Sequence, residues 1–164
     1  MTKVLAGHVA PKFSLNGAGG KCFSLEAALK KGPVAAAFFK ISCPVCQFTL
    51  PFLERLHKAY GGDRVSVVGI SQDDAPDTKE FCEEYGISFP TVLDEDGYPV
   101  SNQYGLTNVP TIVLINPDGK VGVSSMGFSK ADLETINSEL ARAAGRSPAP
   151  LFHPDEVVPD FKPG

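Results

Sequence analysis

A strand-like segment that runs directly into a helix, with two cysteines at the junction, constrains the fold of this chain more than any other feature. Residues 34–39 (VAAAFF) are apolar without polar alternation, which is typical of a central strand covered on both faces. A Cys-Pro-Val-Cys segment follows at residues 43–46, and apolar residues then recur at a helical period as far as Gly61. Pro44 suits the first position of a helix, where its missing N–H costs nothing. The pattern therefore predicts an α/β fold with Cys43 at a helix N-terminus.

The rest of the chain alternates strand-like and helix-like segments. Short apolar pieces at residues 13–15 and 22–25 flank a glycine-rich loop and predict an N-terminal β-hairpin. Residues 111–115 and 120–124 flank an Asn-Pro-Asp-Gly turn and should pair antiparallel, and Ser129 should cap a final helix. The other expected strands are residues 65–70 and 89–93, and the other expected helices are residues 44–61, 77–85 and 100–104. This order predicts a mixed central sheet with helices on both faces.

Length and composition favour a single folded unit followed by a tail. The chain has 164 residues, of which 43% are hydrophobic and 21% charged, and this is enough to bury a core without disulfides. We expect residues 1–145 to form one domain. Residues 146–164 carry prolines at positions 148, 150, 154, 159 and 163, a density that excludes a regular helix or a central strand. The tail is therefore expected to be extended or disordered.

Charge and hydropathy exclude several classes of function. The formal net charge is −4 and the sequence has no run of Lys or Arg, so nucleic acid is not an expected partner. No stretch approaches the roughly 18 to 20 apolar residues that a membrane-spanning helix needs. The N-terminus lacks the apolar core of a secretory signal. We therefore expect a cytoplasmic protein, or a periplasmic one if a signal segment has been removed.

The two cysteines at the strand–helix junction have the spacing of a redox pair. At a helix N-terminus, unpaired backbone N–H groups and the helix dipole favour the Cys43 thiolate, which is the form that attacks a disulfide. Cys46 follows three residues later, on the neighbouring turn. It can therefore reach the sulfur of Cys43 and resolve a mixed disulfide. Neither an organic cofactor nor a metal is needed for this chemistry.

Zinc binding is the alternative interpretation of the pair. A structural zinc ion needs four ligands. The remaining cysteines and histidines are Cys22, Cys82, His8, His57 and His153, and none is paired at a metal-ligand spacing. Cys82 lies on the apolar side of a short predicted helix and is expected in the core. Cys22, in the hairpin, is expected to be more accessible, as a third thiol or as a partner for Cys82.

Three sequence blocks carry a resemblance to a known family. Residues 7–15 (GHVAPKFSL) match a G-x-x-A-P-x-F-x-L opening, and residues 38–46 (FFKISCPVC), followed by Pro51 in the helix, match a dithiol active-site block. Residues 109–111 (VPT) precede the antiparallel strand pair. In these features the chain resembles the thioredoxin superfamily, and within it the TlpA/ResA-like branch of AhpC/TSA-related proteins, over roughly residues 7–144.

The resemblance implies a thioredoxin-like fold and a substrate-binding loop opposite the cysteines. It implies that Pro110 is cis, that the backbone of Val109 hydrogen-bonds an extended substrate, and that Thr111 helps to shape the loop. Pro44 and Val45, between the two cysteines, are assigned to substrate binding with them. The implied partners are protein or small-molecule disulfides and dithiols, and a redox partner.

The chain departs from the family pattern beside the cysteines. Ser42 stands where a tryptophan is usual, and the chain contains no tryptophan. Ala37 occupies the position of a buried acid that assists deprotonation of the second cysteine in thioredoxins, so proton transfer must use water or another group. Lys40 is close in sequence and, as a cation, would favour the Cys43 thiolate; a solvated lysine at the strand end is the alternative.

Two other functions compete with disulfide exchange. A peroxidase of the peroxiredoxin type shares the opening motif, but it needs a P-x-x-x-T/S-x-x-C loop that neither cysteine of the pair has. A non-catalytic interaction module is the second alternative. In it, the tail Leu151–Gly164 would dock on a partner as an extended strand or a polyproline segment. Its expected anchors are Phe152, Val157, Val158 and Phe161.

The sequence thus predicts a thiol-disulfide oxidoreductase in which Cys43 attacks and Cys46 resolves. The Val109–Pro110 loop is expected to bind the substrate. Pro44 and Val45 carry no charge, so they do not point to a strongly oxidising couple, and we expect a moderately reducing protein.

Overall fold

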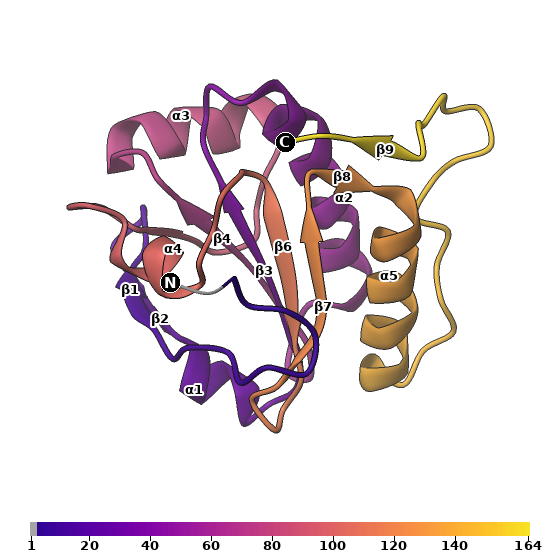
Figure 1. The fold of residues 1–164 in the computed structure, drawn as a ribbon. Helices are drawn as coiled ribbons and strands as arrows, with labels where there is room; N and C mark the ends of the chain where they lie inside the picture. The colour runs from indigo at the N-terminus through magenta and orange to yellow at the C-terminus, as the bar shows by residue number, and fades with distance from the viewer. Residues whose placement is uncertain (1–2) are drawn as a thin grey trace.

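The computed structural model describes residues 3–164, and a five-stranded sheet forms its centre (Figure 1). The strands lie in the order β5-β4-β3-β6-β7, with the bounds Thr91–Leu93, Ser66–Ser71, Val34–Phe39, Thr111–Ile115 and Val121–Met126. β3 pairs parallel with β4 and antiparallel with β6. All residues of β3 are buried, as expected of its central place. The predicted α/β fold with a mixed central sheet is confirmed.

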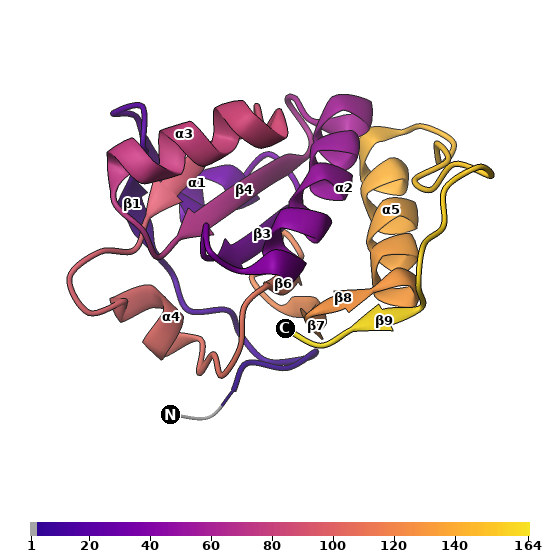
Figure 2. The same ribbon diagram turned by 90° about the horizontal axis from the view of Figure 1, so that it is seen from above.

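Helices cover both faces of the sheet. Contacts in the two hydrophobic clusters place α2 (Pro44–Tyr60), α3 (Ala75–Tyr85) and α5 (Lys130–Ala144) on one face. They place α1 (Leu25–Leu29) and α4 (Pro99–Gln103) on the other. Figure 2 shows α2 beside α3 and α5 above the strands, with α4 on the opposite side. Within residues 3–164, no helix combines the length and apolar character needed to cross a membrane.

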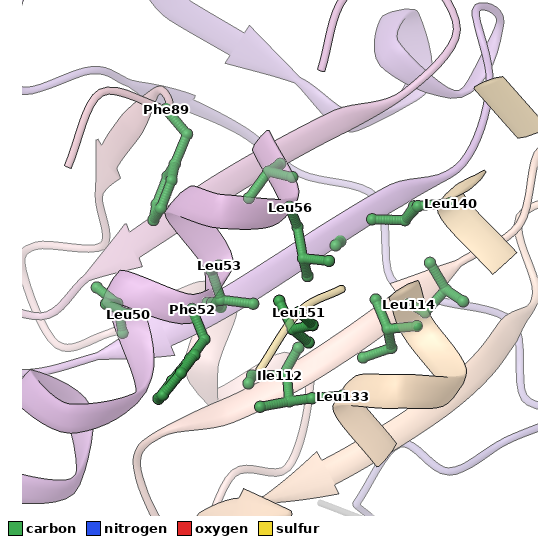
Figure 3. Packing of buried hydrophobic residues seen from close by; sticks show 14 of the residues in the cluster. Leu50, Phe52, Leu53, Leu56, Phe89, Ile112, Leu114, Leu133, Leu140 and Leu151 are labelled. Carbon is green, nitrogen blue, oxygen red and sulfur yellow. The ribbon is translucent and has the colours of Figure 1, made fainter. Parts of the chain in front are cut away.

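The core divides into two clusters because side chains alternate along β3. Its odd-numbered residues join the cluster under α2 and α5, and its even-numbered residues join the cluster under α1 and α4. In the first cluster, leucines of α2 and α5 meet β6 and one residue of the tail (Figure 3). The labelled residues include Leu53, Leu56, Leu114, Leu133 and Leu151. This packing holds α2 against one face of the sheet, so that the two cysteines at its start lie near the end of β3.

The N-terminal hairpin is confirmed, with one helix that the sequence pattern did not predict. β1 (Ser14–Asn16) and β2 (Cys22–Ser24) pair antiparallel. Residues 22–25 were expected to be strand throughout, but Leu25 begins α1. The Ser24 hydroxyl accepts a hydrogen bond from the Ala27 N–H at 3.3 Å and caps the helix. A helix of five residues is too short to give a recognisable hydrophobic period.

The antiparallel strands and the final helix also form as predicted. β6 pairs with β7, and the Ser129 hydroxyl accepts a hydrogen bond from the Asp132 N–H at 3.3 Å to cap α5. A short strand, β8 (Phe128–Ser129), was not predicted. It pairs antiparallel with β9 (Phe161–Lys162) in the tail. The proline-rich segment therefore contributes an edge strand. Prolines are compatible with an edge strand but not with a central strand, because they cannot donate a backbone hydrogen bond.

The tail was expected to be extended or disordered, and in the structure it packs on the domain in an extended path. Leu151 is 5% exposed and belongs to the first core cluster. The Phe152 ring lies 5.0 Å from the Phe52 ring, between centroids. Of the four expected anchors, Phe152 and Val158 contact this core, whereas Val157 is 97% exposed and Phe161 57% exposed. The tail thus lies on its own chain, and whether it also reaches a partner stays a prediction.

An ion pair fastens the first half of the tail to α2. Arg55 donates to both carboxylate oxygens of Glu156, at 2.8 and 2.7 Å, and also to the Leu151 carbonyl at 2.9 Å. This bidentate contact holds the pKa of Glu156 at about 2, well below its usual range. The stretch from Leu151 to Glu156 is therefore firmly attached at neutral pH.

We predict that Leu151→Ala lowers the free energy of unfolding by about 2–4 kcal/mol, because it empties a buried leucine site. Urea denaturation followed by far-UV circular dichroism measures the change. Val157→Ala is the matched control in the same segment, and its effect should stay within about 0.5 kcal/mol because the side chain is exposed. Equal stabilities of the two variants would contradict the packing of the tail.

Candidate active site

Cys43 occupies the N-cap of α2, where the chain leaves β3. Its backbone is extended, with φ −87° and ψ 115°, and Pro44 follows in the first turn. The Cys43 sulfur accepts a hydrogen bond from the Cys46 N–H at 3.2 Å. A sulfur atom thus fills the place that a serine or aspartate oxygen usually takes. The sulfur therefore lies at the helix end where backbone N–H groups lack partners within the helix.

Cys46 lies one turn further along α2 and differs from Cys43 in its surroundings. Its side chain is fully buried, whereas Cys43 is partly exposed. Burial, followed by the hydrogen bond with Cys43, raises the pKa of the Cys46 thiol. Both cysteines are free thiols in this structure. The pair therefore combines one accessible sulfur at the helix end with one protected sulfur behind it.

The loop before β6 faces the cysteines. The Val109–Pro110 peptide is cis, and the Cys43 thiol donates to the Val109 carbonyl across 3.5 Å. Thr111 is buried, and its hydroxyl donates to the Asn108 carbonyl at 2.7 Å, which fixes the loop. The structure thus brings Val109, Pro110 and Thr111 together with Cys43, although they are far apart in sequence.

The remaining predicted site residues lie around this centre. Pro44 is exposed and Val45 is partly buried at the start of α2. Lys40 is exposed, and its carbonyl accepts a hydrogen bond from the Cys43 N–H at 3.3 Å. Lys40 and Val109 line one hollow of about 240 Å³ next to the loop, with polar residues of the β4 and α4 ends. The structure therefore leaves Lys40 beside the site and open to solvent.

Two residues that the sequence analysis did not single out hold the loop before Cys43. The Asp73 carboxylate accepts a hydrogen bond from the Ile41 N–H at 2.8 Å, and the Gln47 side chain donates to the Ile41 carbonyl at 2.9 Å. The Asp73 charge also adds a small part to the raised pKa of Cys46. Asp73 follows β4, whose carboxyl end lies beside that of β3. The sequence signal that could have identified Asp73 is an acidic residue directly after a buried strand that neighbours β3.

The other cysteines and histidines stand apart from the pair. Cys22 is exposed, with its sulfur 3.1 Å from the Ser14 hydroxyl, and Cys82 is partly buried, with its sulfur 3.5 Å from the Thr91 hydroxyl. Both are free thiols, so no disulfide joins them in this structure. Burial raises the pKa of the Cys82 thiol. Across residues 3–164, His, Cys, Asp and Glu side chains form no group of three or more that could hold a metal ion.

The mixed sheet, the N-terminal hairpin and a dithiol at the head of α2 define a protein of the thioredoxin fold. Comparisons with known proteins agree. The family model described as the AhpC/TSA family matches residues 6–124. The solved thiol:disulfide interchange protein of the thioredoxin family from Chlorobium tepidum is 28% identical, with a TM-score of 0.68, covering 88% of this chain and 99% of its own. The chain belongs to the AhpC/TSA family.

Two curated relatives carry the name thiol-disulfide oxidoreductase ResA. The one from Halalkalibacterium halodurans is 32% identical over 117 residues, which are 71% of this chain and 65% of that protein. The one from Bacillus thuringiensis is 31% identical over 120 residues, which are 73% of this chain and 68% of that protein. The chain thus spans about two thirds of the length of these relatives.

We predict that brief treatment of the reduced native protein with iodoacetamide at pH 7 labels Cys43 at least about tenfold faster than Cys46, because the thiolate reacts and must be accessible. Since burial raises the pKa of the Cys46 thiol, its labelling should stay slow at this pH and also at moderately alkaline pH. Tandem mass spectrometry of the tryptic peptide that contains both cysteines measures the ratio.

The exposed Cys22 serves as an internal reference for reagent activity in this labelling experiment. In urea, where burial is lost, Cys43 and Cys46 should react at similar rates. Similar rates in the native protein would contradict the difference between the two sulfurs.

Proposed function

We propose that this protein is a thiol-disulfide oxidoreductase that works through Cys43 and Cys46. The Cys43 thiolate attacks one sulfur of a substrate disulfide, forms a mixed disulfide and releases the other substrate sulfur as a thiolate. Cys46 then loses its proton and attacks the Cys43 sulfur, which releases the second substrate thiolate. Two electrons pass to the substrate, and the protein is left with a Cys43–Cys46 disulfide. The reverse sequence oxidises a substrate dithiol.

The observation that carries the proposal is the difference between the two thiols at one helix end. Cys43 is partly exposed and its sulfur, which accepts a hydrogen bond from the Cys46 N–H, is the one that a substrate can reach. Cys46 is buried with a raised pKa and therefore stays protonated until a mixed disulfide brings it into use. This division of roles is what attack followed by resolution requires.

Substrate binding is assigned to the residues around Cys43. The backbone of Val109, held by Pro110 and Thr111, would pair with an extended substrate and place its disulfide over Cys43. Pro44 and Val45 would contact the substrate from the helix end, and Lys40 would favour the Cys43 thiolate as a nearby cation. A two-electron dithiol couple needs no metal or organic cofactor. The partners are disulfide or dithiol substrates and a second redox protein that renews the pair.

We predict that the protein accelerates reduction of insulin disulfides by dithiothreitol, and that Cys43→Ser and Cys46→Ser both reduce the rate to that of dithiothreitol alone. Turbidity of the released insulin B chain measures the reaction. Cys22→Ser is the matched control and should keep full activity, because Cys22 lies in the hairpin. When pre-reduced Cys46→Ser protein is mixed with insulin without dithiothreitol, a mixed disulfide at Cys43 should accumulate and be visible by mass spectrometry, since no resolving thiol is present.

Hydrogen peroxide consumption, followed in parallel, separates the alternatives. Robust peroxide turnover that depends on Cys43 would favour a peroxidase. Inactivity with both insulin and peroxide would favour an interaction module. Loss of insulin reduction in only one of the two cysteine variants would contradict the two-step mechanism.

A further inference from the structure

The end of the tail lies beside the Val109–Pro110 loop. A Cβ atom placed on Gly164 would be 2.5 Å from the Val109 carbonyl oxygen, and one placed on Gly127 would collide with the Lys162 carbonyl. Residues 161–164 therefore pass from β8 over Gly127 to the loop that faces Cys43. Figures 1 and 2 both show the C-terminal end near β8 and the start of α2.

This last part of the tail adds a strand to the domain. Phe128 pairs with Lys162 and Ser129 with Phe161 in the antiparallel β8–β9 ladder. The Lys130 N–H donates to the Asp160 carbonyl at 2.9 Å and extends the contact. A segment of extended backbone thus already occupies the β8 edge, next to the proposed nucleophile.

The hold on this segment is weaker than the hold on the first half of the tail. Phe161 is 57% exposed, and the Lys162 ammonium lies over the Phe48 ring, 4.9 Å from its centroid, at the protein surface. By contrast, Leu151 is buried and Glu156 is bound by Arg55. Residues 159–164, which follow the core contact of Val158, can therefore leave the β8 edge while the anchor stays in place.

We propose that the edge of β8, Gly127 and the Val109 carbonyl form a surface that binds an extended polypeptide beside Cys43, and that residues 159–164 are its intramolecular occupant. A polypeptide carrying a disulfide displaces this segment and pairs with β8 as an added strand. A small-molecule disulfide needs only the partly exposed Cys43. The inference rests on the proposed function and narrows its substrate class to polypeptides that present an extended segment, with a small residue opposite Val109.

Deletion of residues 159–164 tests the proposal. It removes the occupant and keeps the anchor from Leu151 to Glu156, so the urea midpoint should change little. An occupant that covers the surface in two thirds or more of the molecules lowers apparent affinity about threefold or more. The deletion should therefore raise kcat/KM for insulin by that factor and leave kcat/KM for 2-hydroxyethyl disulfide unchanged. Unchanged insulin kinetics, or equal gains on both substrates, would overturn the proposal.

A point variant and a binding measurement complete the test. Gly164→Val keeps the tail but forces its end away from Val109. Like the deletion, it should raise kcat/KM for insulin. Val157→Ala, on the exposed part of the same tail, is the matched control and should change nothing. In a Cys43→Ser background, S-alkylated insulin B chain should bind more tightly after the deletion. Equal binding by the full chain and the deletion variant would overturn the proposed binding surface. Tighter binding by the deletion variant, together with no insulin reduction by any variant, would count against the proposed function alone.

Discussion

Burial of β3 on both faces is the constraint on which the rest of this structure depends. A strand without a solvent face lies in the interior of the sheet, and the end of β3 determines where α2 begins. Pro44 starts the helix at once, and Cys43 becomes the N-cap through its sulfur. The proposed chemistry of the pair follows from this junction, because it leaves the Cys43 sulfur accessible at the helix end and buries the Cys46 sulfur behind it.

The two sulfurs differ because α2 presents them to different surroundings. The Cys43 side chain contacts the Val109 loop, and the Cys46 side chain packs in the core. Thioredoxins, which the chain resembles, have a buried acid where this chain has Ala37, and here the nearby acid, Asp73, follows β4. Asp73 accepts from the N–H of Ile41 and Gln47 donates to its carbonyl, so the approach to Cys43 is fixed by one side chain after β4 and one of α2 itself.

The two halves of the tail have different roles. The first half stabilises the fold, and the last residues lie over the surface beside Cys43. Its first half contributes a leucine to the core and a carboxylate to Arg55, which are contacts that unfolding must break. Its last residues form a short edge strand with an exposed phenylalanine. Proline density could not distinguish these halves, because it excludes regular structure in both and says nothing about which side chains find a core. Only the positions of α2, α5 and β8 make that distinction.

By itself, the sequence determined the alternation of strands and helices, the place of Cys43 and Cys46 at a helix N-terminus, and the hairpin, because these depend on local periodicity and on glycine and proline geometry. The sequence did not predict the short helix α1 or the strand β8, because each is too short to show a hydrophobic period. The family resemblance already implied a Val109 loop opposite Cys43, whereas tertiary structure alone decided the hydrogen bond from Ile41 to Asp73 and the path of the tail. These contacts join segments distant in sequence, and their geometry exists only once the sheet has set the distances between them.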